Sequence, residues 1–305
     1  MRIGVTGSHG FIGSNLSNEL FKSGLQKRTF ERFDRKKYDL FDVDSLKGFV
    51  EDKDVIVHLA GANRSCNSEL VRVNTLGTLN LLEAIRKYSA INHVRFIFAS
   101  SLQVYGVSSS LKFFKESYPT KPITMYGLSK KFAEETVQKY EEKYGLEALI
   151  LRIASVYGPG CKPFYNSVIS TFVYQALKGL PITINGTGKS SRDFIYVRDL
   201  TKIFLKAIEI KAKVTTVNVC TGVPTSLDDL IKKLVTIIGK NLVITRCEEI
   251  PDNFLIGDPS LCRRVFGLEN ITALEDGLKH TVEWVKNNLN IKGSAWKPMA
   301  KDQLA

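Results

Sequence analysis

Tyr126 and Lys130 are four residues apart in the segment YGLSK. On a helix, residues with this spacing lie one above the other on the same face. A nearby ammonium group lowers the pKa of a phenol from its reference value of about 10, so the tyrosine can exchange a proton near neutral pH. Such pairs are also common on solvated helix faces, so the pair indicates proton transfer only if other parts of a site accompany it.

Ser101 is the second candidate hydroxyl group. It follows the apolar run VRFIFA (94–99), which has the character of a buried strand. In α/β sheets, ligand sites lie at the carboxyl ends of the strands. The Ser101 hydroxyl would orient a substrate oxygen and share its proton with Tyr126. We therefore expect Ser101, Tyr126 and Lys130 to form a catalytic trio.

A glycine pattern, G-x-x-G-x-x-G, occupies the segment GSHGFIG (7–13) between a strand-like run and a helical pattern. Glycines let the backbone turn tightly and approach a pyrophosphate, and the helix that follows offers unpaired N–H groups to it. The alternative is an ordinary strand–helix turn. The combination of strand, spacing and helix favours a dinucleotide site. The residues expected to contact the cofactor here are Gly7, Gly10, Phe11, Ile12 and Gly13.

Asp34 lies 21 positions after Gly13, at the end of the second expected strand. An acid at this place accepts hydrogen bonds from the adenosine ribose and favours NAD. Its neighbour Arg35 could instead pair with a 2′-phosphate, which keeps NADP open. Asp39 and Leu40 begin the segment DLFD (39–42), which could place a carboxylate beside the adenine amino group. A helix cap or a solvated loop is the other interpretation of Asp39.

These groups require an alternation of strands and helices. Apolar runs predict strands at residues 29–33, 54–59, 94–99 and 149–153, and helical periodicity predicts helices at 11–23, 73–88, 129–144 and 274–287. The run DVIVHL (54–59) has the continuous apolar character of a parallel strand that is buried on both faces. The sequence therefore predicts an α/β fold with a doubly wound parallel (Rossmann) sheet and a smaller C-terminal α/β lobe for the substrate.

The alternation becomes irregular after residue 160, which predicts two domains. We expect residues 1–160 to form the dinucleotide-binding domain, with residues 193–210 returning to it. Residues 161–192 and 211–290 would form the substrate lobe, and residues 291–305 a tail.

The composition of the 305-residue chain excludes several classes of protein. Its five cysteines are scattered and form no C-x-x-C pair, so we expect neither disulfides nor a metal site. The net charge of +12 is spread along the chain without a nucleic-acid motif, so we expect no nucleic-acid partner. No apolar run approaches the roughly 20 residues of a membrane span, and the N-terminus lacks a signal peptide. We expect a cytoplasmic protein.

The sequence resembles the extended short-chain dehydrogenases grouped as NAD-dependent epimerases/dehydratases, the family of UDP-glucose 4-epimerase. The resemblance extends from Gly7 to about Trp284. It is carried, in order, by the segments GSHGFIG (7–13), HLAG (58–61), NTLGTLNLLEA (74–84), SSLQVYG (100–106), YGLSKKFAEE (126–135), LRIASVYGPG (151–160) and RDFIYVRDL (192–200).

The resemblance implies roles for further residues. Leu59, Ala60 and Gly61 would line the cofactor, and Asn74 would contact it. Tyr126 and Lys130 would also touch the cofactor, Lys130 through the nicotinamide ribose.

Arg192 would hold the pyrophosphate of a nucleotide sugar, a role that suits a guanidinium group. Ser101 and Tyr126 would also contact the substrate. The alternative for Arg192 is an ion pair with Asp193 or another neighbouring acid. The helices of residues 74–88 and 129–144 resemble those of the family's homodimer interface; ordinary packing on the sheet is the other interpretation.

Three departures from the family pattern narrow the expected reaction. Leu102 and Gln103 stand where family dehydratases carry Asp-Glu, and related decarboxylases also keep an acid at the position of Gln103. Ser155 replaces a common asparagine.

We expect C4 epimerisation of a UDP-hexose or UDP-N-acetylhexosamine through a 4-keto intermediate. The alternative is an NAD(P)H-dependent reductase of a nucleotide 4-keto-6-deoxy sugar. A non-catalytic dinucleotide sensor would not need the trio. His58 and His9 are expected to be structural.

Overall fold

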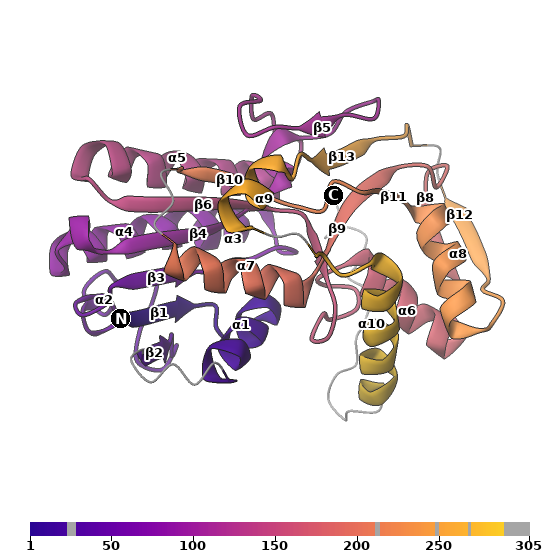
Figure 1. Ribbon diagram of the computed structural model, residues 1–305, viewed down its shortest axis with the longest axis horizontal. Coiled ribbons are helices and arrows are strands. Elements are labelled where there is room, and N and C mark those ends of the chain that lie inside the picture. The colour runs from indigo at the N-terminus through magenta and orange to yellow at the C-terminus, as the bar shows by residue number, and fades with distance from the viewer. Residues whose placement is uncertain (23–28, 211–213, 248–249, 268–269, 290–305) are drawn as a thin grey trace. The chain divides into compact units, whose positions relative to one another are not determined.

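A computed structural model describes residues 1–22, 29–210, 214–247, 250–267 and 270–289 of the chain (Figure 1). These residues divide into two compact units. The first contains Met1–Gly106, Tyr118–Ile153 and Thr201–Val217. The second contains Val107–Ser117, Ala154–Leu200 and the described residues from Asn218 onward. The expected tail, 291–305, lies outside the described residues.

The first unit is built on a sheet with the strand order β10-β6-β4-β3-β1-β2. The strands are β1 (Arg2–Thr6), β2 (Thr29–Arg32), β3 (Val55–His58), β4 (Arg95–Ser101), β6 (Glu147–Ile153) and β10 (Thr216–Val219). Neighbours from β2 to β6 are all parallel. The strand order reverses beside β1, which lies between β2 and β3, and a doubly wound sheet binds its ligands at such a point. The expected Rossmann fold is confirmed.

Helices flank this sheet (Figure 1). They are α1 (Phe11–Lys22), α2 (Lys47–Val50), α3 (Asn67–Val71), α4 (Gly77–Tyr88), α5 (Met125–Tyr144) and α7 (Val197–Glu209), the last of which begins in the second unit. Shorter turns are the 3₁₀ segments η2 (Ile91–His93) and η3 (Leu102–Tyr105). Among the described residues, no helix is both long and apolar enough to cross a membrane.

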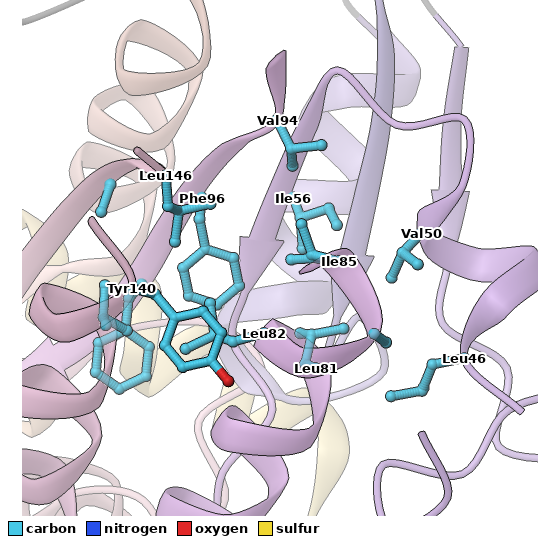
Figure 2. Packing of buried hydrophobic residues seen from close by; sticks show 14 of the residues in the cluster. Leu46, Val50, Ile56, Leu81, Leu82, Ile85, Val94, Phe96, Tyr140 and Leu146 are labelled. Carbon is cyan, nitrogen blue, oxygen red and sulfur yellow. The ribbon is translucent and has the colours of Figure 1, made fainter. Parts of the chain in front are cut away.

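The core of the first unit lies between the sheet and helices α2, α4 and α5 (Figure 2). Ile56 and Phe96 point from β3 and β4, Leu81 and Leu82 from α4, and Tyr140 from α5. All four residues of β3 are buried, as a strand covered on both faces requires. This packing fixes the strand ends that carry the candidate site.

Two helices begin earlier than the periodicity predicts. Helix α5 begins at Met125 because the Thr124 hydroxyl accepts a hydrogen bond from the Gly127 N–H and caps the helix. Helix α4 is preceded by α3 and by a π-helical turn, η1 (Arg72–Leu76), so the helical run starts at Asn67. A π-turn inserts an extra residue into a helix and re-aims its side chains. Here it carries Asn74.

The second unit contains a mixed sheet with the order β11-β9-β13-β5, in which β7 also pairs with β9. Its strands are β5 (Phe113–Phe114), β7 (Ser155–Tyr157), β9 (Ser191–Tyr196), β11 (Pro224–Ser226) and β13 (Phe254–Gly257). A separate pair joins β8 (Ile182–Asn185) to β12 (Ile244–Cys247). The helices are α6 (Val168–Lys178), α8 (Leu227–Ile238), α9 (Ser260–Phe266) and α10 (Leu274–Asn288).

The boundaries of the two units differ from the expected ones. Residues 193–200 do not return to the main sheet, because β9 pairs with β7, β11 and β13 of the second unit. The returning stretch is Thr201–Val217, which supplies part of β10. Residues 107–117 and 154–160, expected in the first domain, also belong to the second unit. An apolar strand pattern does not specify which sheet the strand joins.

Candidate active site

The glycine turn brings two backbone segments into close contact. Gly7 has a φ of +63°, and a Cβ there would lie 2.6 Å from the Ala60 nitrogen. A Cβ on Gly13 would collide with the Gly7 carbonyl oxygen, while the Gly10 N–H donates to that same oxygen at 2.9 Å. A larger residue at position 7 would push the turn away from the segment after β3, and one at position 13 would push α1 away from the turn. The turn therefore presents the N–H groups at the start of α1, beside Phe11 and Ile12, to an anion.

Asp34 lies two residues beyond β2 and is partly buried. Its Oδ1 accepts a hydrogen bond from the Lys36 N–H at 2.9 Å, which orients the carboxylate, and Arg35 is exposed. Asp34 thus lies just beyond β2, and its expected contact with the adenosine ribose stays a prediction. The structure leaves the Arg35 guanidinium available at the same edge.

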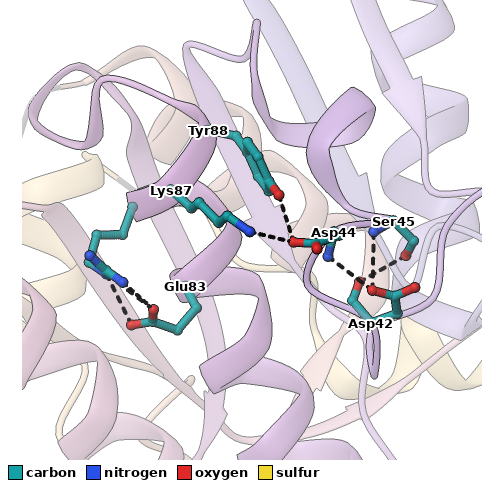
Figure 3. A network of polar contacts seen from close by, with 7 residues as sticks. Asp42, Asp44, Ser45, Glu83, Lys87 and Tyr88 are labelled. Atoms are coloured by element: carbon teal, nitrogen blue, oxygen red, sulfur yellow. Dashed lines mark hydrogen bonds and ion pairs between the residues drawn. The ribbon is translucent and has the colours of Figure 1, made fainter.

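The loop after Asp34 is built from local hydrogen bonds. Asp39 is exposed, and its Oδ1 accepts from the Phe41 N–H at 2.9 Å, whereas the Leu40 carbonyl accepts from Asn80 of α4 at 2.9 Å. Further along, Asp44 accepts from both Lys87 and Tyr88 of α4 (Figure 3). These contacts favour the structural interpretation of Asp39 and hold the loop against α4.

Asn74 is fully buried in the π-turn, and its amide is engaged by the protein. Its Oδ1 accepts from the Ala62 N–H at 2.8 Å. Its Nδ2 donates to the Ala62 carbonyl and to the Ser129 hydroxyl, both at 2.9 Å. These contacts hold Asn74 against the segment that follows Leu59, Ala60 and Gly61, and the expected cofactor contact of Asn74 stays a prediction.

Lys130 is enclosed between strand β4 and residue 61. Its Nζ donates to the Ala99 carbonyl at 2.8 Å, and a Cβ on Gly61 would lie 3.3 Å from that Nζ. The side chain is 5% exposed, and this burial lowers the pKa of the Lys130 ammonium to about 8, against a smaller opposing effect of Glu134. A buried ammonium beside a strand end is electrostatically effective because little water screens it.

Tyr126 and Ser101 lie on α5 and β4, the two elements that the hydrogen bond of Lys130 joins. Tyr126 is on the first turn of α5, partly buried, and one turn before Lys130. Ser101 ends β4, two residues after Ala99, and its Oγ accepts from the Gln103 N–H at 3.2 Å. The structure thus places all three groups of the expected trio at the carboxyl end of β4 and the start of α5.

A buried ion pair that the sequence analysis did not identify supports these elements. Glu134 on α5 accepts three hydrogen bonds from Arg152 of β6, the shortest at 2.8 Å, and a fourth from Ser100 at 2.5 Å. Arg152 also donates to the Tyr105 hydroxyl at 2.8 Å. The sequence contained one signal for Glu134, which is its position four residues after Lys130, on the same face of the helix. The network ties α5 to both sides of Ser101.

Arg192 lies in the second unit, on β9, and has only neutral partners among the described residues. Its Nη1 donates to the carbonyls of Ser191 and Asn253 at 3.0 Å, and its Nη2 to the Asn253 Oδ1 at 2.5 Å. The neighbouring Asp193 is not its partner, because that carboxylate accepts from Thr221 and Gly222 instead. A partly buried guanidinium group that has no carboxylate partner in the described part of the chain is suited to a phosphate.

Comparison with known proteins gives one family across most of the chain. The NAD dependent epimerase/dehydratase family model matches residues 3–220. A Methanocaldococcus jannaschii protein with the provisional name UDP-glucose 4-epimerase is 33% identical over 317 residues, covering 93% of this chain and 98% of that protein. GDP-6-deoxy-D-talose 4-dehydrogenase of Aggregatibacter actinomycetemcomitans is 32% identical over 281 residues, covering 88% and 92%.

A solved structure extends the similarity to the fold. UDP-glucuronic acid 4-epimerase from Bacillus cereus, in complex with UDP-glucuronic acid and NAD, superimposes with a TM-score of 0.80 at 26% identity. The match covers 94% of this chain and 100% of that one.

Proposed function

Because this chain belongs to the NAD-dependent epimerase/dehydratase family, we propose that it binds NAD and inverts C4 of a UDP-hexose or UDP-N-acetylhexosamine. The observation that carries the proposal is the burial of the Lys130 ammonium against Ala99 and Gly61, one helical turn from Tyr126. A desolvated cation at this place favours an ionised tyrosine and so a proton acceptor near neutral pH.

The residues at the carboxyl edge of the sheet fit a dinucleotide. The start of α1 would receive the pyrophosphate, and Asp34 would accept hydrogen bonds from the adenosine ribose. The Asp34 carboxylate would repel a 2′-phosphate, so NAD is the proposed cofactor, and Arg35 is the residue that would permit NADP. Fluorescence titration with both cofactors tests this choice. Tighter binding of NADPH that is lost in Arg35→Ala would overturn it.

Tyr126 is the proposed acid and base. It would take the proton of the sugar 4-hydroxyl, with Ser101 holding that oxygen, and would later return a proton to the same oxygen. NAD held at the start of α1 and by Asp34 would supply a hydride acceptor for C4 and, once reduced, a hydride donor. The substrate between the two transfers would be a 4-keto sugar. Transfer back to its opposite face would give the C4 epimer with no net oxidation.

Arg192 is the proposed anchor of the nucleotide sugar. Face inversion requires the keto sugar to turn over while the rest of the molecule stays bound. A guanidinium group whose partners, as far as the structure describes the chain, are carbonyl and amide oxygens can pair with the pyrophosphate throughout this rotation. The strongest charge–charge contact would then lie away from the rotating ring.

A reductase of a nucleotide 4-keto-6-deoxy sugar is the second candidate. It would use the same trio, and the 32% identity to GDP-6-deoxy-D-talose 4-dehydrogenase favours it specifically. The two reactions differ in cofactor use. An epimerase regenerates its NAD in every cycle, whereas a reductase consumes external NAD(P)H in proportion to product.

The deciding experiment needs no added reductant. The protein is incubated with UDP-glucose or UDP-N-acetylglucosamine, and NMR is used to look for the C4 epimer. Formation of UDP-galactose or UDP-N-acetylgalactosamine supports epimerisation. If no epimer forms, but a UDP- or dTDP-4-keto-6-deoxy sugar is reduced with matching loss of NAD(P)H, the reductase proposal replaces the epimerase proposal.

We also propose that the chain forms a homodimer through α4 and α5. Two apolar side chains support this surface: Phe132 on α5 is 40% exposed and Leu76, at the end of η1, is 43% exposed. A hydrogen bond of 3.0 Å from Thr75 to the Ser129 carbonyl holds η1 against α5. Analytical ultracentrifugation should give a dimer that Phe132→Glu converts to monomer. A monomeric wild-type protein would contradict the proposal.

A further inference from the structure

A closed ring of hydrogen bonds lies beneath the segment that approaches Lys130. His58 Nδ1 contacts the Thr6 hydroxyl at 2.6 Å, and that hydroxyl accepts from the Ala60 N–H at 3.1 Å. On the other side, His58 Nε2 contacts the Thr78 hydroxyl at 3.0 Å, and Thr78 bonds the Asn74 carbonyl at 2.6 Å. The Asn74 side chain then bonds Ala62, which closes the ring at Gly61.

The direction of every hydrogen bond in this ring is determined. The Asn74 carbonyl can only accept, so the single hydroxyl hydrogen of Thr78 is committed to it. Thr78 must therefore accept from His58, which places the imidazole hydrogen on Nε2. His58 Nδ1 is then an acceptor, and Thr6 donates to it while accepting from Ala60. Each hydroxyl both donates and accepts once, so no donor in the ring lacks a partner.

The four side chains of the ring are buried and lie on β1, β3, η1 and α4. His58, Thr6, Thr78 and Asn74 are each 0% exposed. Thr6 and His58 are register partners on β1 and β3, and the His58 ring stacks on Phe98 of β4, 5.9 Å between centroids. Burial lowers the pKa of His58 to about 3, with a smaller contribution from Lys130. The imidazole is thus neutral throughout the physiological range.

The segment held by the ring is the one beside the Lys130 amine. Ala60 is held through Thr6, Ala62 through Asn74, and Gly61 between them lies against Lys130 Nζ. Thr6 and Asn74 are far apart in sequence, and His58 with Thr78 connects them on the side of the ring opposite residues 60–62. His58 therefore joins the glycine turn, through Thr6, to the π-turn, through Thr78.

We propose that His58 is a positioning residue: by closing this ring it holds residues 60–62 against Lys130 and thereby sets the affinity for the dinucleotide. The inference rests on the proposed function in one respect, that the dinucleotide binds at this edge. His58 touches neither reacting atoms nor cofactor in this role. It acts through Thr6 and Thr78.

The test opens the ring on either side with variants that keep side-chain shape. Thr6→Val and Thr78→Val each remove one hydroxyl, and His58→Asn keeps an acceptor for Thr6 but cannot reach Thr78. Thr281→Val is the matched control, because Thr281 is 0% exposed and its hydroxyl donates to the Gly277 carbonyl of its own helix in the second unit. Amide hydrogen exchange of residues 59–62 is measured without cofactor, and the NAD dissociation constant by fluorescence titration.

We expect faster exchange in this segment and a dissociation constant raised by about tenfold in each ring variant, the effect of losing one buried hydrogen bond. Because the ring needs all its members, Thr6→Val/Thr78→Val should weaken NAD binding about as much as either single change. Thr281→Val should leave both measurements unchanged.

Three outcomes would overturn the proposal. They are unchanged exchange and NAD affinity in folded Thr6→Val, additive effects in the double variant, or an equal effect of Thr281→Val. None of these measurements uses sugar turnover, so their results do not depend on whether the protein catalyses epimerisation. A wild-type protein that binds no dinucleotide would contradict the proposed function, whereas the exchange data would still test the ring.

Discussion

The Thr124 hydroxyl donates a hydrogen bond of 3.1 Å to the side-chain oxygen of Gln103 while it caps helix α5. Gln103 therefore supports the start of the helix that carries Tyr126. It stands where dehydratases of the family carry an acid, and the preceding Leu102 is buried and apolar.

The first prediction concerns the fate of the 4-keto sugar. Neither Leu102 nor Gln103 can transfer a proton, so we expect no elimination of water from UDP-glucose or dTDP-glucose. Product analysis by NMR and mass spectrometry should show no 4-keto-6-deoxy sugar. Its appearance at a rate comparable to epimerisation would show that another residue supplies the acid and base.

The second prediction tests the proton-transfer group. Tyr126→Phe should lower turnover by roughly 10²–10⁴-fold, because only the acid–base hydroxyl is lost. The NAD dissociation constant should stay close to that of the wild type. Tyr140→Phe, on the same helix, is the control; it loses a bond to Glu83 but no catalytic hydroxyl. Undiminished turnover in Tyr126→Phe would remove Tyr126 from the mechanism.

The third prediction follows from the pKa of Lys130, about 8 in the folded chain. Raising the pH through this value removes the ammonium charge that favours ionised Tyr126, so turnover at saturating cofactor should fall above pH 8. The free energy of unfolding depends on pH in the opposite direction. Because the pKa of Lys130 is lower in the folded chain than in the unfolded chain, the contribution of Lys130 to stability is fully present above the usual value of about 10.4 and is lost as the pH falls through 8.

Lys130→Met provides the check on both statements. Its residual turnover should lack the alkaline limb near pH 8. Its free energy of unfolding, measured in urea, should rise less than that of the wild type between pH 8 and 10. A wild-type profile that is flat from pH 7 to 10 would show that Lys130 keeps its proton throughout.

The fourth prediction concerns Arg192. Arg192→Ala should raise KM for the nucleotide sugar by about 10- to 100-fold, the loss of a charge-assisted hydrogen-bonded pair. Arg192→Lys should recover little, since an ammonium group cannot replace the guanidinium fork. NAD affinity should be unaffected. The control is Arg264→Ala, which removes an exposed arginine of the same unit. Equal KM values for the Ala variant and the wild type would disprove the anchor.

The fifth prediction concerns the buried pair of Glu134 and Arg152, 3% and 7% exposed in their side chains. Arg152→Met leaves a buried carboxylate without its partner and should cost about 3–5 kcal/mol of unfolding free energy. Adding Glu134→Leu should restore most of that loss, because no charge then stays buried. Urea denaturation of the two single variants and the double variant completes the cycle. A loss below about 1 kcal/mol in Arg152→Met would contradict this account.

Local patterns predicted the parts of the fold that depend on neighbouring residues. The run VIVH is apolar throughout, and β3 is buried on both faces. The glycines at 7 and 13 were predicted to allow close backbone approach, and a Cβ at either position would collide with backbone atoms. His58 is a buried residue at the end of β3, as expected.

Features that depend on distant partners could not be predicted in this way. The strand that carries Arg192 has an ordinary strand pattern, and its assignment to the second sheet depends on β7, β11 and β13. The partners of Asn74 lie 12 and 55 residues away. The hydrogen bonds of a buried amide depend on packing rather than on spacing, so the contacts of Asn74 with Ala62 and Ser129 could not be predicted from the sequence.

The chain passes back and forth between the two units, each of which is assembled from three separate stretches. Consequently, no single cut yields either unit whole. A fragment ending at Ile153 would lack Thr201–Val217 and the whole of β10, the edge strand beside β6. It would expose a hydrogen-bonding edge that normally has a neighbour, and such edges promote self-association. We therefore expect proteolytic fragments of this protein to aggregate, and attempts to produce the dinucleotide-binding unit alone to require grafting of its distant strand.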